Sequence, residues 1–340
     1  MTRYPRGFSG DRPFSSSMTN FGPKLLGLYL QLGGGIAIGW LLGRWLPPSV
    51  ALRLGQSLFW VGVPLSIFSF LRQTDLSGGV WIAPIAAWAA MLLGIALAAL
   101  WMRRSSQRLG PGTDGPLSPW AKPSQGSFLL SSMVGNTGYL GYPIALAIAG
   151  PQYFGWALFY DLIGSTIGAY GLGVLIAARY GMSAPSNLQM LQALLKNPAL
   201  ASLLLGLLWK DQPMPALLER TLSHLAWGVI GVALVLLGMR LSQLATWNQW
   251  PHAIASLTIK MLIVPLVLGA ALPWLGLSSP AQQVLILQMA MPPAFATLVI
   301  TEAYDLDRSL TVTSLAVGTF SLLIVLPFWL WLFGFTASSA

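Results

Sequence analysis

The sequence predicts an all-α integral membrane protein with ten transmembrane helices, arranged as a 5+5 inverted repeat. Of its 340 residues, 55% are hydrophobic and only 8% are charged, whereas a soluble domain carries about 25% charged residues. Ten apolar stretches come close to the ~20 residues that a transmembrane helix needs. Polar or proline-rich breaks interrupt the fourth and ninth stretches, at matching positions in the two halves, as is typical of repeat-built transporters.

A polar tail precedes the expected spans. Residues 1–23 are rich in Ser, Pro and Arg, and we expect them to be disordered. No small-residue cleavage site follows, so the apolar run from Lys24 is predicted to be a retained span rather than a signal peptide. A further hypothesis places the translation start at Met18. The expected spans are 24–46, 53–71, 80–102, 126–149, 153–178, 188–209, 219–239, 251–274, 281–304 and 309–334.

Two regions differ from a simple alternation of spans and short loops. Lys196-Asn197-Pro198 interrupts the sixth stretch, so its helix is predicted to start at Asn197 and to span only a short distance. Residues 103–125 form the longest loop, which is basic and rich in Pro and Gly, and we expect it to be irregular.

The two halves of the chain are predicted to be related repeats, residues 24–180 and 181–340. Trp60 lies between two arginines that bracket the second span, and Trp227 lies between two that bracket the seventh at nearly the same spacing. Trp81 opens the third span as Trp250 opens the eighth. Because each repeat holds an odd number of spans, the two halves must be inverted relative to one another.

The basic residues predict an orientation in the cell membrane. Loops after odd-numbered spans hold ten Lys and Arg residues, and loops after even-numbered spans hold three. By the positive-inside rule the odd loops are cytoplasmic, and both termini lie outside. The net charge of +9 is scattered over short loops, which favours membrane orientation over nucleic-acid binding.

The break in the fourth span is the strongest functional signal. Its centre runs Gly135-Asn136-Thr137-Gly138-Tyr139-Leu140-Gly141-Tyr142-Pro143. Non-helical backbone at membrane depth is tolerated only inside protein or beside a water-filled cavity. We therefore expect Asn136, Thr137 and the amides around them to bind a polar or anionic ligand, aided by the N-terminus of the following helix. The structural alternative is close helix packing through small residues.

The ninth span carries the matching break, and two charges lie inside other spans. Pro292 and Pro293 remove two N–H donors from the helix, and we expect them to contribute to the site. Asp161 in the fifth span and Lys260 in the eighth are costly in lipid, so each is expected to face a cavity or a partner. The alternative for Asp161, which lies near the outer part of its span, is that it reaches only the membrane interface. Lys260 is interpreted either as a tether to backbone carbonyls or as a group that neutralises an anion or takes part in proton coupling.

Several classes of function are excluded or disfavoured. The chain has no cysteine, so it has no disulfide or thiolate metal site, and its two histidines form no metal-binding spacing. No cofactor is expected. No Walker, Rossmann or nucleophilic-serine motif is present, which argues against an ATP-driven pump and against an enzyme.

At these residues the sequence resembles the auxin efflux carrier family, over about Lys24 to Phe333. The fourth-span break resembles that family's Asn-Thr followed by Gly-x-Pro. Three further matches, in order along the chain, are Val63-Pro64-Leu65, Asn197-Pro198, and Met291-Pro292-Pro293 with Glu302-Ala303-Tyr304.

The resemblance implies that the fourth and ninth helices unwind and cross near the membrane midplane, with substrate at the crossing. It implies a scaffold of helices 1, 2, 6 and 7, a transport domain that moves as an elevator, and a homodimer. The fold would be shared with bile acid symporters. The expected substrate-binding residues are Asn136, Thr137, Gly138, Gly141, Pro143, Met291, Pro292, Pro293, Ser66 and Phe68.

The predicted function is secondary transport of a small organic anion, a mono- or dicarboxylate. The chain lacks the long loop after the fifth helix of many plant members, so it resembles a compact, bacterial inner-membrane carrier. Coupling to protons is preferred over coupling to sodium. The alternatives are a sodium-coupled organic anion symporter of the bile acid symporter type and a membrane sensor that does not transport.

Overall fold

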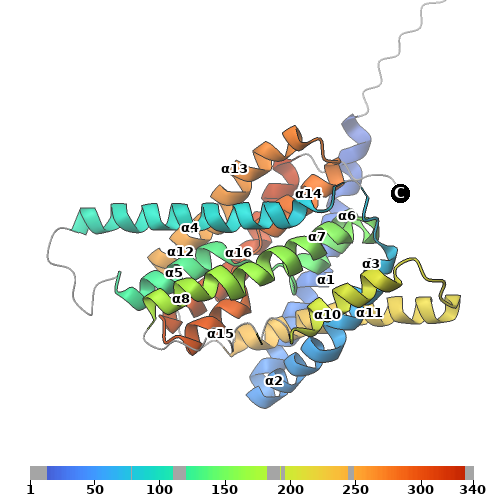
Figure 1. Cartoon of the computed structure of the whole chain (residues 1–340), viewed down its shortest axis with the longest axis horizontal. Helices are drawn as coiled ribbons and strands as arrows, with labels where there is room; N and C mark the ends of the chain where they lie inside the picture. Colours follow the sequence, from blue (N-terminus) through green and yellow to red (C-terminus); the bar gives the residue numbers. More distant parts are fainter. Residues whose placement is uncertain are drawn as a thin grey trace, which may run out of the picture.

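The computed structural model describes residues 14–77, 79–109, 120–181, 192, 196–243 and 249–333, which are helical apart from short turns and breaks (Figure 1). The first half contains α1 (Phe14–Trp45), α2 (Pro48–Ser57), η1 (Leu58–Gly62), α3 (Val63–Gln73), α4 (Ile82–Leu109), α5 (Lys122–Met133), α6 (Gly141–Ala149), η2 (Pro151–Tyr153), α7 (Phe154–Phe159), η3 (Tyr160–Thr166), η4 (Ala169–Gly173) and α8 (Val174–Tyr180). The second half contains α10 (Pro198–Trp209), α11 (Ala216–Ser242), α12 (Trp250–Leu257), η5 (Thr258–Ile263), α13 (Val264–Ala271), η6 (Leu272–Leu275), α14 (Ser279–Met289), α15 (Phe295–Ala303) and α16 (Arg308–Leu332).

Six helical stretches of the described chain are long and apolar enough to cross a membrane. They are Pro48–Gln73, Ile82–Ser106, Pro151–Tyr180, Ala216–Ser242, Trp250–Leu275 and Arg308–Leu332. The protein is therefore a multi-pass membrane protein, with exposed large apolar side chains such as Trp274 and Ile324 on its outer surface. The other four expected spans coincide with α1, with the split pairs α5–α6 and α14–α15, and with the 12-residue α10. The count of ten spans stays a prediction.

Helix boundaries correct two expectations and confirm one. Helix α1 already begins at Phe14, so residues 14–23 are helical rather than part of a disordered tail, and residues 1–13 lie outside the described chain. The expected irregular loop is helical at both ends, because α4 runs on to Leu109 and α5 begins at Lys122. Helix α10 begins where expected, since the Asn197 side chain caps it by accepting the Ala199 N–H at 2.9 Å.

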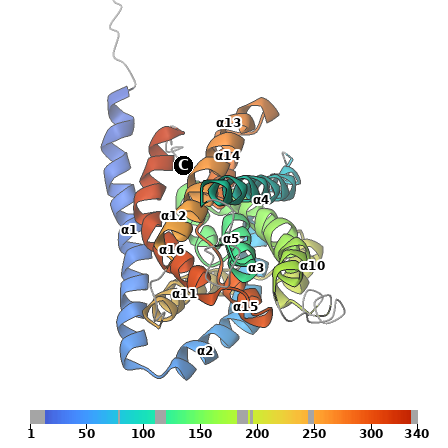
Figure 2. The same ribbon diagram turned by 90° about the vertical axis from the view of Figure 1, so that its left-hand side faces the viewer.

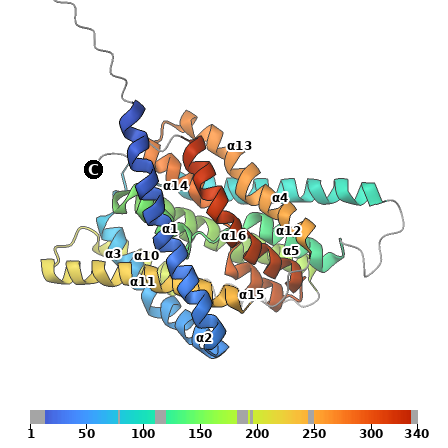
Figure 3. The same ribbon diagram turned by 180° about the vertical axis from the view of Figure 1, so that it is seen from behind.

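One set of helices, called here the α11 group, consists of α1, α2, η1, α3, α10 and α11, which pack on one another. Figure 3 shows α1 crossing α11, and Figure 2 shows α1 along one flank of the molecule. Glycines let the two backbones approach: a Cβ on Gly39 would lie 1.9 Å from the Val235 carbonyl oxygen, and one on Gly238 would lie 2.0 Å from that of Ile36. Such small-residue contacts are the usual means of helix association in lipid.

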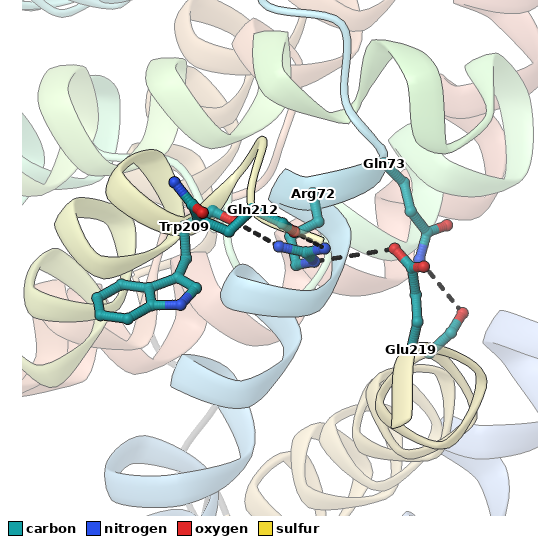
Figure 4. Close-up of polar contacts among 6 residues, drawn as sticks. Arg72, Gln73, Trp209, Gln212 and Glu219 are labelled. Atoms are coloured by element: carbon teal, nitrogen blue, oxygen red, sulfur yellow. Dashed lines mark hydrogen bonds and ion pairs between the residues drawn. The ribbon is translucent and has the colours of Figure 1, made fainter. Parts of the chain in front are cut away.

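Arg72 of α3 contacts both α10 and α11 at one end of the α11 group (Figure 4). Its guanidinium donates to the carbonyls of Trp209 and Gln212, the latter at 2.9 Å, at the C-terminal end of α10. It also lies 3.8 Å from the carboxylate of Glu219 on α11. A planar, forked guanidinium can serve several acceptors at once, so one side chain ties α3, α10 and α11 together.

The remaining helices, called here the α5 group, are α4 to α8 and α12 to α16 with their intervening η segments. Their core is buried and apolar around Phe128, Leu285 and Trp329. The Trp329 indole N–H donates to the Met261 carbonyl at 3.0 Å, where the π-helical segment η5 leaves the regular helix ladder. The α5 group holds both broken helices, so the fold places each break inside protein.

Candidate functional site

The two helix breaks meet and pair with one another. The N–H of Asn136 donates to the Pro292 carbonyl at 2.7 Å, and the N–H of Ala294 donates to the Val134 carbonyl at 3.1 Å. Between these two hydrogen bonds, Gly135 and Pro293 form an isolated antiparallel bridge. The backbone groups released by one break are thus satisfied by the other, as the lack of water inside a membrane requires.

Prolines and glycines make this crossing possible. Pro292 and Pro293 have no N–H to continue the helix ladder from α14, so the chain leaves the helix there. Both proline rings approach Gly318 of α16, where a Cβ would lie 3.0 Å from each. Gly135 is equally confined, because a Cβ there would lie 3.1 Å from the Lys260 Nζ. The crossing is therefore packed on both sides, and its position is fixed by its neighbours.

A cavity of about 380 Å³ lies beside the crossing, between it and the α11 group. Its volume is in the range of small-molecule sites in proteins, about 300–1,000 Å³. The polar side chains that line it are Gln56, Ser66, Asn136, Thr137, Tyr139, Tyr142, Asp161, Ser165, Thr166, Tyr170, Asn197 and Arg240. The rest of the lining is mainly apolar, with Phe59, Val229 and Phe295 as examples. The cavity therefore suits a ligand with both a polar and an apolar part.

Asp161 is joined directly to the fourth-span break. It lies on the π-helical segment η3, and its carboxylate accepts hydrogen bonds from the Thr137 hydroxyl and, at 2.7 Å, from the Tyr142 hydroxyl. A Cβ on Gly138 would lie 3.3 Å from this carboxylate, so the glycine leaves room for it. Asp161 therefore lines the cavity and contacts two side chains of the break, which is the first of the two positions expected for it from the sequence.

Asn136 presents its side chain to the cavity although the residue is only 4% exposed. Its backbone N–H donates to the Pro292 carbonyl and its carbonyl accepts the Gly141 N–H. A side-chain amide at the wall of a largely apolar cavity is stabilised by a hydrogen-bonding partner. The arrangement leaves one donor group and one acceptor group at the cavity wall, where a polar ligand could satisfy them.

The structure brings together some of the expected site residues and separates others. The expected residues that line the cavity are Ser66, Asn136, Thr137, Gly138, Pro143 and Asp161. The expected residues that are not among its lining residues are Gly141, Met291, Pro292, Pro293, Phe68 and Lys260. Met291 is fully buried, and Gly141 faces the Gln288 side chain.

Phe68 is the plainest correction to the expected lining. It lies two residues after Ser66 on α3, and residues two apart on a helix point to different faces. With Ser66 turned to the cavity, Phe68 is carried away from it. The sequence placed both residues on the same helix but did not determine which face each one occupies.

Lys260 lies behind the crossing rather than in the cavity. It is only 2% exposed, and its Nζ donates to the Met289 carbonyl at 2.5 Å. Met289 is the last residue of α14, where unpaired carbonyls and the helix dipole favour a positive charge. The contact is the one expected of a tether to backbone carbonyls. The geometry provides no contact between Lys260 and a ligand in the cavity.

Most of the lining was not expected from the sequence, and Tyr139, Arg240 and Phe295 are examples of this part. Arg240 was counted as a loop cation because the seventh span was expected to end at 239, whereas α11 runs to Ser242. Tyr139 lies inside the recognised break, so its position was a usable signal. In the part of the chain that the structure describes, no three His, Asp or Glu side chains gather where a metal could bind.

Comparison with known proteins identifies the class of this multi-pass membrane protein. The model of the membrane transport protein family matches residues 35–330. The chain belongs to this family, which includes the auxin efflux carriers, and it is a membrane transporter. The match covers both breaks, the cavity and both helix groups.

Three relatives show how far the likeness extends. An uncharacterized transporter of Methanothermobacter thermautotrophicus is 26% identical over 286 residues, 82% of this chain and 88% of that protein. An uncharacterized transporter of Methanocaldococcus jannaschii is 27% identical over 212 residues, 61% of this chain and 68% of that protein. Auxin efflux carrier component 3a of Oryza sativa is 30% identical over 142 residues, 39% of this chain and 22% of that protein.

Proposed function

We propose that this transporter is a secondary active carrier of a small organic anion, which binds at the crossing of the two helix breaks. The observation that carries the proposal is the pairing of Asn136 with Pro292 beside a cavity. Secondary transporters commonly bind substrate where discontinuous helices expose backbone groups. The similarity to auxin efflux carrier component 3a of Oryza sativa also supports an organic anion as the substrate.

The chemistry of the cavity supports recognition of a carboxylate with an apolar body. Asn136 offers a side-chain amide, and Arg240 offers a positive charge at the same cavity. The apolar walls would hold the remainder of the ligand and exclude water, which strengthens the polar contacts. Proton coupling is proposed through Asp161, whose carboxylate lies at the cavity and contacts the break through Thr137.

We further propose elevator-type alternating access, with the α11 group as scaffold and the α5 group as the moving body. The two groups meet through apolar contacts such as Phe70 with Phe154 and through a few hydrogen bonds, among them Asp75 N–H to the Gln152 carbonyl at 3.1 Å. An interface of this kind can slide without breaking many strong interactions. The same proposal includes ten spans in an inverted repeat, external termini, an inner-membrane location and a homodimer.

Counterflow of labelled substrate in proteoliposomes tests the proposal. A thermal-shift screen of organic acids on detergent-purified protein first selects the substrate. Asn136→Ala should abolish counterflow while the protein keeps its melting temperature, because the amide contacts ligand rather than protein. Gln282→Ala is the matched control: it removes an amide of α14 that donates to the Leu277 carbonyl outside the cavity, and it should transport normally.

Three results would contradict parts of this function. Full counterflow by Asn136→Ala would show that the Asn136 side chain is not needed to bind the substrate. Uptake that requires sodium would favour a sodium-coupled symporter. Uptake that is independent of sodium but depends on pH would support proton coupling. Binding without any counterflow by the wild-type protein would indicate a sensor rather than a carrier.

A further inference from the structure

We propose that Arg240 is the residue that recognises the substrate anion, and that the substrate is a monoanion with an apolar body rather than a small dicarboxylate. This inference rests on the proposed function and adds to it a specific residue and a narrower substrate class. Arg240 lies in the last turn of α11. It lines the wall of the cavity that the α11 group forms.

The guanidinium is held at the boundary between the two helix groups. It lies over the ring of Phe295, the first residue of α15, at 5.3 Å from the ring centroid. Arg240 also lines a smaller pocket, which shares Tyr139 and Phe295 with the cavity. A cation over an aromatic face is attracted by the ring while its edge remains free to donate hydrogen bonds. An anion that reaches Arg240 would therefore contact both helix groups.

The charges of the cavity leave Arg240 without a counter-charge. Arg240 and Asp161 are the two formally charged side chains among the described residues of the lining. Asp161 is engaged by Thr137 and Tyr142, and Arg240 forms no ion pair with a carboxylate of the described residues. A guanidinium in apolar surroundings attracts a carboxylate strongly and can bind it through two hydrogen bonds.

The Arg240 guanidinium packs closely against Gly55 of α2, where a side chain would occupy its position. A Cβ on Gly55 would lie 2.7 Å from the Arg240 Nη2, closer than real Cβ atoms approach other heavy atoms. An alanine there would push the guanidinium away but would leave its charge in the protein. The fold should tolerate this change, because the contact is with the far end of a flexible side chain and alanine favours a helix more than glycine does.

The same charges argue against a dicarboxylate. One positively charged side chain faces the cavity, so the second carboxylate of a small diacid would meet only uncharged polar or apolar side chains and the Asp161 carboxylate, and no second cation. Burying an unpaired carboxylate is costly, and a nearby like charge adds to the cost. A monocarboxylate with an alkyl or aromatic body would satisfy Arg240 with its head and contact Phe59, Val229 and Phe295 with its body.

Isothermal titration of the detergent-purified full chain tests this inference. The probes are octanoate, benzoate and indole-3-acetate as monoanions, malonate as the dianion, and octanamide as a neutral probe. We expect a monoanion to bind wild-type protein more tightly than malonate does. Arg240→Gln should weaken that binding by about 10- to 100-fold, the loss expected for hydrogen bonds to a charged group, and should leave octanamide binding unchanged.

Three further variants make the test specific. Arg240→Lys and Gly55→Ala should each weaken monoanion binding by an intermediate factor. Arg220→Gln removes an exposed cation of the same helix, outside the lining, and should bind like wild type. If Arg240→Gln does not yield folded protein, Arg240→Lys and Gly55→Ala decide, and wild-type binding by both would overturn the role of Arg240.

The outcomes separate the two levels of the proposal. Equal monoanion binding by wild type and Arg240→Gln overturns the inference and leaves the proposed function standing. Tighter binding of malonate than of every monoanion overturns the substrate class. A wild-type protein that binds none of the acids contradicts the proposed function itself.

Discussion

The N–H of Asn136 donates to the carbonyl of Pro292 at 2.7 Å, which joins two helix breaks from opposite halves of the chain. This hydrogen bond uses the backbone of Asn136 and leaves its side chain to the cavity. The same residue therefore holds the crossing and offers a ligand contact. Substitutions near it should separate these two roles.

Gly135→Ala should loosen the crossing. The added methyl group would lie 3.1 Å from the Lys260 Nζ and 3.3 Å from the Met291 carbonyl oxygen. Crowding in a well-packed interior typically costs about 1–3 kcal/mol, so the melting temperature and the counterflow rate should both fall. Gly171→Ala, where nothing lies within 4 Å of the new methyl group, should match wild type. If both variants melt and transport alike, the crossing is not confined at Gly135.

Asp161→Asn should flatten the dependence of transport on pH. Asparagine can still accept a hydrogen bond from Thr137 or Tyr142, but it cannot exchange a proton. Transport rates of wild type and variant are compared between about pH 5 and 8, the range in which a coupled acid–base group governs rates. An unchanged pH profile in the variant would assign proton coupling elsewhere.

Asp75→Asn is the control for this comparison. The Ser77 backbone N–H and hydroxyl hydrogen-bond the Asp75 carboxylate and hold its pKa below its ordinary value. Because that pKa is lowered, Asp75 stays ionised throughout the range tested. Its replacement should leave the pH profile as it is in the wild type.

Arg72→Ala should destabilise the protein more than Glu219→Gln. The alanine variant leaves the Trp209 and Gln212 carbonyls without their donor, which costs about 1–3 kcal/mol. Glu219 is 47% exposed at its side chain and 3.8 Å from Arg72, so its loss should cost less than about 1 kcal/mol. Thermal unfolding in detergent measures both. Equal losses would mean that the ion pair, and not the carbonyl contacts, holds α3 to α10 and α11.

The positions of the helix breaks were predictable, because a break is a local property of the backbone. Glycines, Asn136 and the Pro292-Pro293 pair cannot continue a regular helix in lipid without other partners. The start of α10 after Asn197 was predictable for the same reason, since the cap and the proline are neighbours in sequence. The length of α4 was not, because residues 103–109 are mostly hydrophilic and fall outside the apolar stretch that defined the span, although the helix continues through them to Leu109.

The composition of the cavity wall was less predictable. Ser66 and Phe68 lie on the same helix, but the rotation of α3 turns only Ser66 to the cavity. Lys260 and Asp161 were both isolated charges within apolar spans, and their depth in the span was all that the sequence told apart. Their neighbours distinguish them: Asp161 contacts Thr137 and Tyr142 at the cavity, and Lys260 contacts the Met289 carbonyl behind the crossing.

The sequence by itself determined that this is a membrane protein of a transporter family with two interrupted helices, because hydropathy and backbone chemistry act over a few neighbouring residues. Only the tertiary structure decided that the interruptions pair with each other and that Arg240 and Phe295 meet across two helix groups. It also decided that Asp161, and not Lys260, lines the cavity. Those relationships depend on how each helix is rotated and where it crosses its neighbours. Packing of the whole chain sets both.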